Sequence, residues 1–140
     1  MASRADVLVD TSFLVAMLDP RDDFHEVATD LAKELDEDAA PLVTADAVFL
    51  ELCAYFARGP LRSEAVRWVE VIRASPGWEV LPLDRPTLAR AEDRYRRHAD
   101  KTWSLTDCFL MEVLDARGTN EVATTDHHFE QAGYRALLRE

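Results

Sequence analysis

The sequence of 140 residues contains only four glycines and two cysteines. Glycine-rich loops that cradle nucleotide phosphates need several glycines close together, and neither a GxGxxG nor a Walker motif is present. Cys53 and Cys108 each lie among apolar residues, as expected for reduced thiols in a cytoplasmic protein. The scarcity of both residue types argues against a nucleotide-binding loop and against a disulfide-stabilised secreted protein.

Long hydrophobic runs are also missing. The longest uninterrupted apolar stretch, Phe13 to Leu18, is far shorter than the ~20 residues of a membrane helix. The segment Met1 to Asp10 contains no apolar run of the length found in signal peptides. These two absences predict a soluble, cytoplasmic protein that has no membrane partner.

Basic residues are few, because 16 Lys and Arg stand against 27 Asp and Glu, for a formal net charge of −11. Proteins that coat nucleic acids usually carry a basic surface, so this charge argues against a general nucleic-acid binder. It leaves open an enzyme that holds a phosphodiester through metal ions. The excess of acidic residues therefore needs a functional explanation.

The pattern of apolar residues predicts one domain over residues 1–140, and the apolar content of 48% suffices for a single core. Short apolar runs read as buried strands and alternate with amphipathic or apolar helical segments. This alternation favours an α/β fold, a three-layer α/β/α sandwich with a short central parallel sheet. The predicted strands are 6–10, 42–44, 78–83 and 121–124, and the predicted helices are 25–37, 46–58, 63–74, 84–98 and 104–117.

Four acidic residues stand in apolar surroundings, where an unpaired charge is costly to bury. Asp10 and Asp126 follow predicted strands, so both should lie at the carboxyl edge of the sheet, where α/β folds place their sites. Glu51 is the only charge in the apolar segment 47–57, which predicts a helix buried on nearly every face. Asp107 occupies the first turn of an apolar helix. Alternatively, Glu51 lies on a narrow polar edge and Asp107 only caps its helix.

Carboxylates that share a pocket repel one another and stay ionised only beside a cation. Ligands that offer only oxygen suit Mg²⁺ or Mn²⁺ better than Zn²⁺. His127 and His128 follow Asp126 directly, but the sequence offers no Cys or third clustered His to complete a zinc site. The acids therefore predict a site for a hard divalent cation, whose natural chemistry is phosphoryl transfer or phosphodiester hydrolysis.

Four ordered motifs resemble the PIN-domain family, and within it most closely the VapC-type toxins of bacterial toxin–antitoxin pairs. They are Val-Leu-Val-Asp10-Thr-Ser, Ala-Val-Phe-Leu-Glu51-Leu, Ser-Leu-Thr-Asp107-Cys and Ala-Thr-Thr-Asp126-His-His-Phe, and they span essentially the whole chain. The resemblance implies a metal-dependent endoribonuclease, with these four acids as catalytic residues and as ligands of Mg²⁺ or Mn²⁺. It also implies an RNA substrate, a small antitoxin protein as partner, and a homodimer.

Three hydroxyl residues belong to the same motifs. Thr124 matches a position where the family usually has Ser or Thr, and Thr11 or Ser12 is expected to add a hydroxyl or backbone contact near the metal. The most basic stretch of the chain, 85–101, offers phosphate contacts to RNA through Arg94, Arg96 and Arg97. The alternative is a solvated helix face with ion pairs between neighbouring turns.

Two other classes of function compete with a nuclease. A haloacid-dehalogenase-like, Mg-dependent phosphatase also begins with an Asp after a buried strand, but it needs a second Asp two residues later, where this chain has Ser12. A non-enzymatic binding module would use the acids only structurally. A binding module would tolerate replacement of the acids by amides without loss of function. A phosphatase would release phosphate from small esters, whereas a nuclease would cleave RNA in the presence of Mg²⁺.

Overall fold

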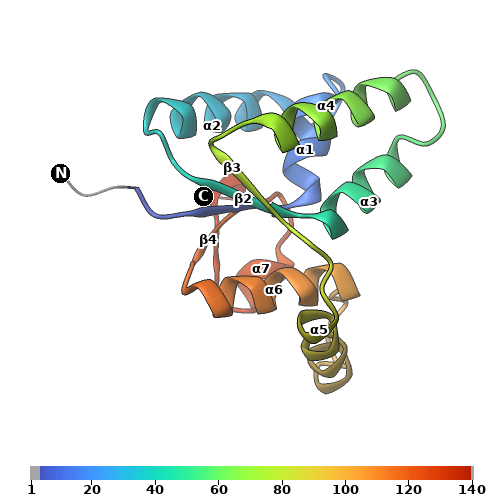
Figure 1. The fold of residues 1–140 in the computed structure, drawn as a ribbon, viewed down its shortest axis with the longest axis vertical. Helices are drawn as coiled ribbons and strands as arrows, with labels where there is room; N and C mark the ends of the chain where they lie inside the picture. The colour runs from blue at the N-terminus through green and yellow to red at the C-terminus, as the bar shows by residue number, and fades with distance from the viewer. Residues whose placement is uncertain (1–3, 140) are drawn as a thin grey trace.

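The computed structural model describes residues 4–139 and contains a five-stranded sheet in which every pairing is parallel (Figure 1). The strand order is β3-β2-β1-β4-β5. The predicted fold class is confirmed, although the sheet has one strand more than the sequence indicated. The strands are β1 (Val7–Val9), β2 (Leu42–Ala45), β3 (Trp78–Leu81), β4 (Glu121–Ala123) and β5 (Arg135–Ala136).

Helices cover both faces of the sheet (Figure 1). On one face lie α1 (Thr11–Leu18), α2 (His25–Glu37) and α4 (Arg62–Ala74), and α3 (Asp46–Tyr55) packs against α1 and α4. On the other face lie α6 (Leu105–Arg117) and the short α7 (His128–Gln131), while α5 (Arg85–Arg97) packs against α6. No helix in the described range 4–139 is both long and apolar enough to cross a bilayer.

Local sequence signals explain where several helices begin and end. The Asp84 carboxylate accepts a hydrogen bond from the Thr87 N–H at the start of α5, and Ser104 and Asp107 form a capping box at the start of α6. Gly118 ends α6 with a φ of 66°, a left-handed conformation that glycine adopts without strain. In contrast, α3 ends at Tyr55, three residues before the predicted end, and the apolar segment after Asp10 forms a helix.

Strand β1 lies at the centre of the sheet and all three of its side chains are fully buried. It pairs with β2 on one side and with β4 on the other. The chain therefore adds β2 and β3 on one side of β1 and then crosses over to add β4 and β5 on the other side. Val9 is opposite Ala123, and the next backbone group along, the Asp10 N–H, donates to the Ala123 carbonyl at 3.1 Å. The residues that follow β1 and β4 therefore lie side by side, at the kind of crevice where open α/β sheets bind ligands.

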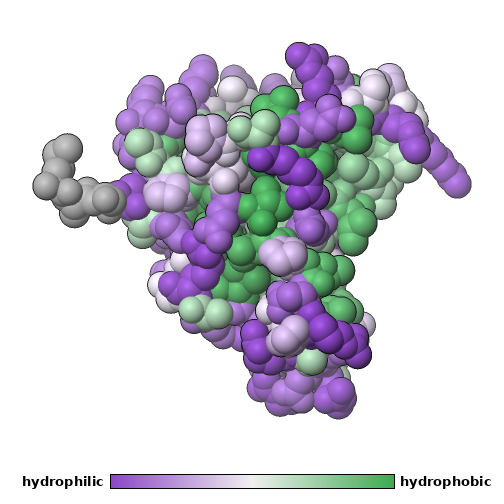
Figure 2. All heavy atoms as spheres, viewed as in Figure 1, coloured by the Kyte–Doolittle hydropathy of each residue, from purple (hydrophilic) through white to green (hydrophobic). Residues whose placement is uncertain are grey.

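Hydrophobic residues are not confined to the core. Figure 2 shows hydrophilic residues over α5 and much of α2 and α4, and hydrophobic residues along the middle of the visible face. Large apolar side chains with substantial exposure include Leu50 on α3, Leu83 before α5 and Leu105 at the start of α6. These three side chains line one shallow groove beside α3.

Candidate active site

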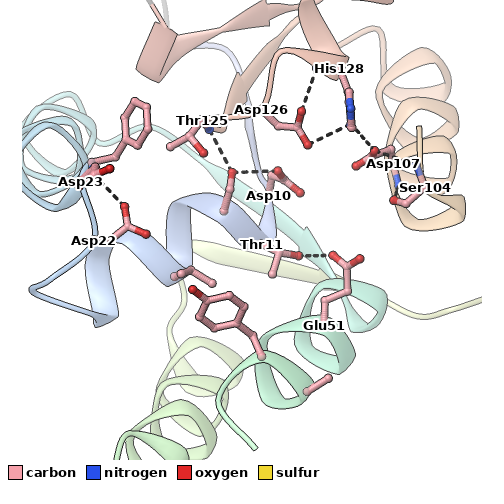
Figure 3. Close-up of a pocket in the computed structure, with 15 residues that line it drawn as sticks. Asp10, Thr11, Asp22, Asp23, Glu51, Ser104, Asp107, Thr125, Asp126 and His128 are labelled. Atoms are coloured by element: carbon pink, nitrogen blue, oxygen red, sulfur yellow. Dashed lines mark hydrogen bonds and ion pairs between the residues drawn. The ribbon is translucent and has the colours of Figure 1, made fainter. Parts of the chain in front are cut away.

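A cleft of about 830 Å³ opens at the carboxyl edge of the sheet (Figure 3). All four acids singled out in the sequence line this cleft, although they come from four separate parts of the chain. The lining residues are Asp10, Thr11, Ser12, Val15, Asp22, Asp23, Phe24, Glu51, Ala54, Tyr55, Ser104, Asp107, Thr125, Asp126 and His128.

Asp10 is the most deeply buried of these acids, with 4% of its surface exposed. Its Oδ2 accepts hydrogen bonds from the hydroxyls of Thr124, at 2.8 Å, and Ser12, at 3.0 Å. Burial, followed by repulsion from Asp107, raises the pKa of Asp10 to about 7, although the two hydroxyl bonds act in the opposite direction. A carboxylate at this position is therefore held by neutral donors only and is poorly stabilised in its ionised form.

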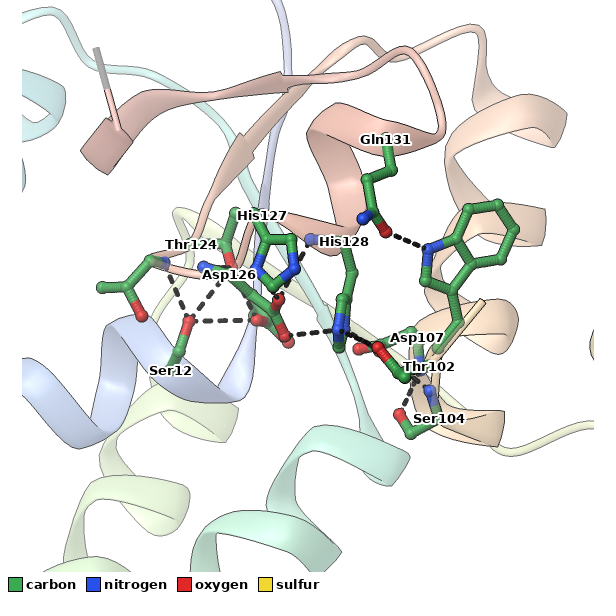
Figure 4. Close-up of polar contacts among 12 residues, drawn as sticks. Ser12, Thr102, Ser104, Asp107, Thr124, Asp126, His127, His128 and Gln131 are labelled. Atoms are coloured by element: carbon green, nitrogen blue, oxygen red, sulfur yellow. Dashed lines mark hydrogen bonds and ion pairs between the residues drawn. The ribbon is translucent and has the colours of Figure 1, made fainter. Parts of the chain in front are cut away.

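The loop after β4 is tied to Asp10 through the same two hydroxyls, those of Ser12 and Thr124, which Figure 4 labels. Thr124 is fully buried, and its Oγ1 accepts the backbone N–H of Asp126 at 3.0 Å while donating to Asp10. The Ser12 Oγ accepts the Thr125 N–H, also at 3.0 Å. This network fixes the loop so that the Asp126 carboxylate lies in the cleft next to that of Asp10 (Figure 3).

Asp107 has two roles at once. Its Oδ2 accepts the backbone N–H of Ser104 at 2.9 Å, which completes the capping box. The same side chain is only 10% exposed and lines the cleft, where Oδ2 lies 2.8 Å from Nδ1 of His128. Asp107 therefore caps α6 and lines the cleft with the same side chain.

Glu51 reaches the cleft from α3 and is half-buried. The Thr11 hydroxyl donates to its Oε1 at 2.6 Å, so the first residue of α1 orients this carboxylate. The prediction that α3 is buried on nearly every face is wrong, because Leu50 and Tyr55 are 64% and 62% exposed. The apolar run of α3 supplies an exposed hydrophobic surface as well as core contacts, which a sequence pattern cannot distinguish.

Two further acids and a histidine line the cleft and were not assigned to it from the sequence. Asp22 and Asp23 lie in the turn between α1 and α2, across the cleft from the other acids (Figure 3). His128, at the start of α7, lies between Asp107 and Asp126. Its position two residues after Asp126 was the available signal, whereas nothing in the local sequence indicates that the turn at Asp22 folds back over the sheet edge.

The three arginines proposed as RNA contacts occupy different environments on α5. The Arg94 side chain is 14% exposed, and it pairs with Glu112 at 2.7 Å and also with Asp115 on α6. Arg96 and Arg97 are 74% and 58% exposed, and each pairs with Asp93. Arg94 thus joins two helices, while the other two guanidinium groups face solvent, and none of the three lines the cleft.

The donors in the cleft fit a hard divalent cation. Within residues 4–139, the lining of the cleft contains several carboxylates and hydroxyls but no Lys or Arg. Asp10 in particular is a buried carboxylate with hydroxyl partners and a carboxylate neighbour, which leaves its negative charge without a protein cation. Oxygen-rich sites of this kind bind Mg²⁺ or Mn²⁺.

Comparison with known proteins supplies the family. The PIN domain matches residues 7–133, which is most of the chain. The chain belongs to the PIN-domain family. No curated protein sequence matches it.

Solved structures share this PIN fold. VapC20 of Mycobacterium tuberculosis, a toxin that cleaves the sarcin–ricin loop, is 24% identical with a TM-score of 0.80, over 91% of this chain and 95% of its own. FitAcB from Neisseria gonorrhoeae is 20% identical with a TM-score of 0.64, over 93% and 94% of the two chains. DNA-bound VapBC from Salmonella typhimurium is 13% identical with a TM-score of 0.64, over 96% and 97%.

Proposed function

We propose that this PIN-domain protein is a metal-dependent endoribonuclease and acts as the toxin of a bacterial toxin–antitoxin pair. The observation that carries the proposal is the convergence of four carboxylates on one cleft of a PIN fold, with no Lys or Arg among the described lining residues. The similarity to VapC20, a toxin that cleaves the sarcin–ricin loop, supports the choice of substrate.

Asp10, Glu51, Asp107 and Asp126 would hold one or two Mg²⁺ or Mn²⁺ ions. Such an ion, when bound, polarises the scissile phosphate and lowers the pKa of a bound water to make it a nucleophile. The protein contributes the positions of the ligands. The hydroxyls of Ser12 and Thr124 orient Asp10, the hydroxyl of Thr11 orients Glu51, and the helix cap of α6 orients Asp107. Ligands held in this way bind metal without a large rearrangement.

RNA must approach an acidic protein, so its phosphates need basic contacts outside the cleft. Arg96 and Arg97 are exposed and are assigned this role. Arg94 is assigned to the contact between α5 and α6, because both of its partners lie on α6. Substitution of Arg94 alone, and of Arg96 together with Arg97, distinguishes a packing role from RNA contact.

The partners proposed for the chain are a small antitoxin and a second copy of itself, and its place of action is the cytoplasm, where RNA is accessible. VapBC and FitAcB, which share the fold, support the proposal of an antitoxin. Light scattering of the purified protein should give about twice the chain mass of 15.9 kDa. A mass equal to one chain would contradict the homodimer without affecting the nuclease.

The nuclease is tested by incubating the purified protein with labelled single-stranded RNA and with a sarcin–ricin loop hairpin, in Mg²⁺ or in Mn²⁺. Cleavage is expected with either ion and should stop in excess chelator. Asp126→Asn should abolish cleavage, whereas Asp30→Asn, which removes an exposed acid on α2, should not. Cleavage that survives exhaustive chelation would refute the metal mechanism, and release of phosphate from small esters without RNA cleavage would favour a phosphatase.

A further inference from the structure

The side chain of His128 lies between two of the four acids, Asp107 and Asp126 (Figure 4). Its Nδ1 lies 2.8 Å from Oδ2 of Asp107 and 3.1 Å from Oδ2 of Asp126, so one nitrogen faces two carboxylates that come from different elements. The backbone N–H of His128 also donates to Oδ1 of Asp126 at 3.0 Å, and the imidazole is only 16% exposed. The ring is therefore fixed between two proposed metal ligands.

The second ring nitrogen has a partner of its own. Nε2 lies 3.1 Å from Oγ1 of Thr102, in the loop that precedes α6. Histidines that bind metals usually donate a hydrogen bond from the nitrogen that is not bound to the metal, and this bond fixes the tautomer and the ring orientation. With Nε2–H donating to Thr102, the lone pair of Nδ1 points at the two carboxylates. In this tautomer three acceptor atoms face one another, an arrangement that a cation between them would stabilise; in the other tautomer, Nδ1–H donates to the carboxylates.

The two distances from Nδ1 to these carboxylate oxygens are compatible with binding of one metal ion. Two neighbouring ligands in an octahedral site with bonds of about 2.1 Å lie about 3 Å apart. The two distances from Nδ1 to the carboxylate oxygens, 2.8 and 3.1 Å, have this value. His127 provides an internal contrast, because its Nδ1 lies 3.7 Å from Asp126 and its side chain is 56% exposed.

We propose that Nδ1 of His128 is a ligand of the divalent cation, together with Asp107 and Asp126, and that this nitrogen makes the site prefer Mn²⁺ to Mg²⁺. The proposal rests on the metal-dependent function proposed above. Imidazole nitrogen binds transition metals well and contributes little to Mg²⁺, which prefers oxygen ligands. A site of oxygen ligands alone, as the sequence predicted, would discriminate less between the two ions.

Pulsed EPR of the full-length protein loaded with Mn²⁺ tests this ligand directly. A coordinated imidazole produces a ¹⁴N modulation in the echo decay, and oxygen ligands do not. The modulation is expected in the parent protein and in His127→Asn, and it should vanish in His128→Asn. Calorimetric titration of the same three proteins should give a Kd for Mn²⁺ about tenfold higher in His128→Asn, with a smaller change in the Kd for Mg²⁺. Thermal melts in chelator establish that each variant is folded.

The parent protein alone can overturn the inference. If it binds Mn²⁺ and cleaves RNA but shows no ¹⁴N modulation, His128 is not a ligand, and the nuclease at the carboxylate site remains. Modulation that persists in His128→Asn assigns the nitrogen to another residue, so His128 is again not a ligand. A parent protein that binds neither ion and cleaves no RNA would overturn both the ligand and the proposed function.

Discussion

Replacement of Asp10 by Asn should stabilise the metal-free protein. The pKa of Asp10 is raised from its ordinary value of 3.8 to about 7, chiefly by burial and next by repulsion from Asp107. A shift of about 3 units at ~1.4 kcal/mol per unit corresponds to about 4 kcal/mol. Asn is uncharged, and its amide oxygen can still accept the hydroxyl hydrogen bonds of Ser12 and Thr124, because both hydroxyls donate to the same atom, Oδ2.

The pH dependence of this effect follows from the direction of the shift. Because the pKa of Asp10 is higher in the folded than in the unfolded state, its favourable contribution is complete below about pH 4 and is lost as the pH rises through about 7. The advantage of Asp10→Asn should therefore be roughly 2 kcal/mol at about pH 5 and about 4 kcal/mol at about pH 8. These values are ceilings, since the cleft can admit water.

Urea unfolding in chelator, followed by circular dichroism at both pH values, measures the difference. Asp30→Asn removes the same charge from an exposed position on α2 and should show no gain that grows with pH. Addition of Mn²⁺ should reverse the order, because the parent protein gains binding energy that Asp10→Asn cannot gain fully. An Asp10→Asn protein that is no more stable than the parent at about pH 8 would show that Asp10 is already neutralised within the protein.

Three other predictions concern the acids, the arginines and the partner. Glu51→Gln should lower the rate of RNA cleavage at least about 100-fold. Its melting temperature in chelator should stay nearly unchanged, since Thr11 can donate to the Gln oxygen. A variant that melts at a much lower temperature yet cleaves at the parent rate would contradict this prediction. The double variant Arg96→Glu, Arg97→Glu should raise the KM for RNA and flatten the salt dependence of KM. Arg94→Ala should instead lower the folding stability by about 2–3 kcal/mol. Identical effects of the two changes on KM would refute the assignment of RNA contact to Arg96 and Arg97 and of helix packing to Arg94. Expression should arrest growth and be relieved by a small co-expressed partner, as seen in colony counts; harmless expression of protein shown to be folded and metal-loaded would contradict the toxin role but not the nuclease.

The fold and the strand-end acids could be predicted because they depend on local and regular features. Apolar runs of strand length, separated by helices, determine a parallel sheet, and in such a sheet Asp10 and Asp126 must lie at the same edge. Asp107 was singled out as a charge in the first turn of an apolar helix, and the start of that helix is set by a capping signal within one turn. These inferences need no knowledge of how distant segments pack.

The remaining features depend on long-range packing and could not be predicted in this way. Strand β5 has two residues, too few for any periodic pattern, and exists through its pairing with β4. Arg94 lies on the same helix as Arg96 and Arg97, and only the packing of α5 on α6 separates its role from theirs. His128 was set aside together with His127 because the sequence offers no Cys or third clustered His to complete a zinc site, whereas the neighbours of His128 in space are Asp107 and Asp126.

The contact between Asp10 and Thr124 joins residues that are 114 positions apart in the chain. Strand β4 must be inserted beside β1 before the cleft has its second wall, and β5 then protects the outer side of β4. During synthesis, the N-terminal half of the protein therefore leaves the ribosome without an assembled site. In the proposed nuclease, the cleft can form only after the segment that carries Asp126 has been synthesised, and this delay would give the proposed antitoxin time to be made.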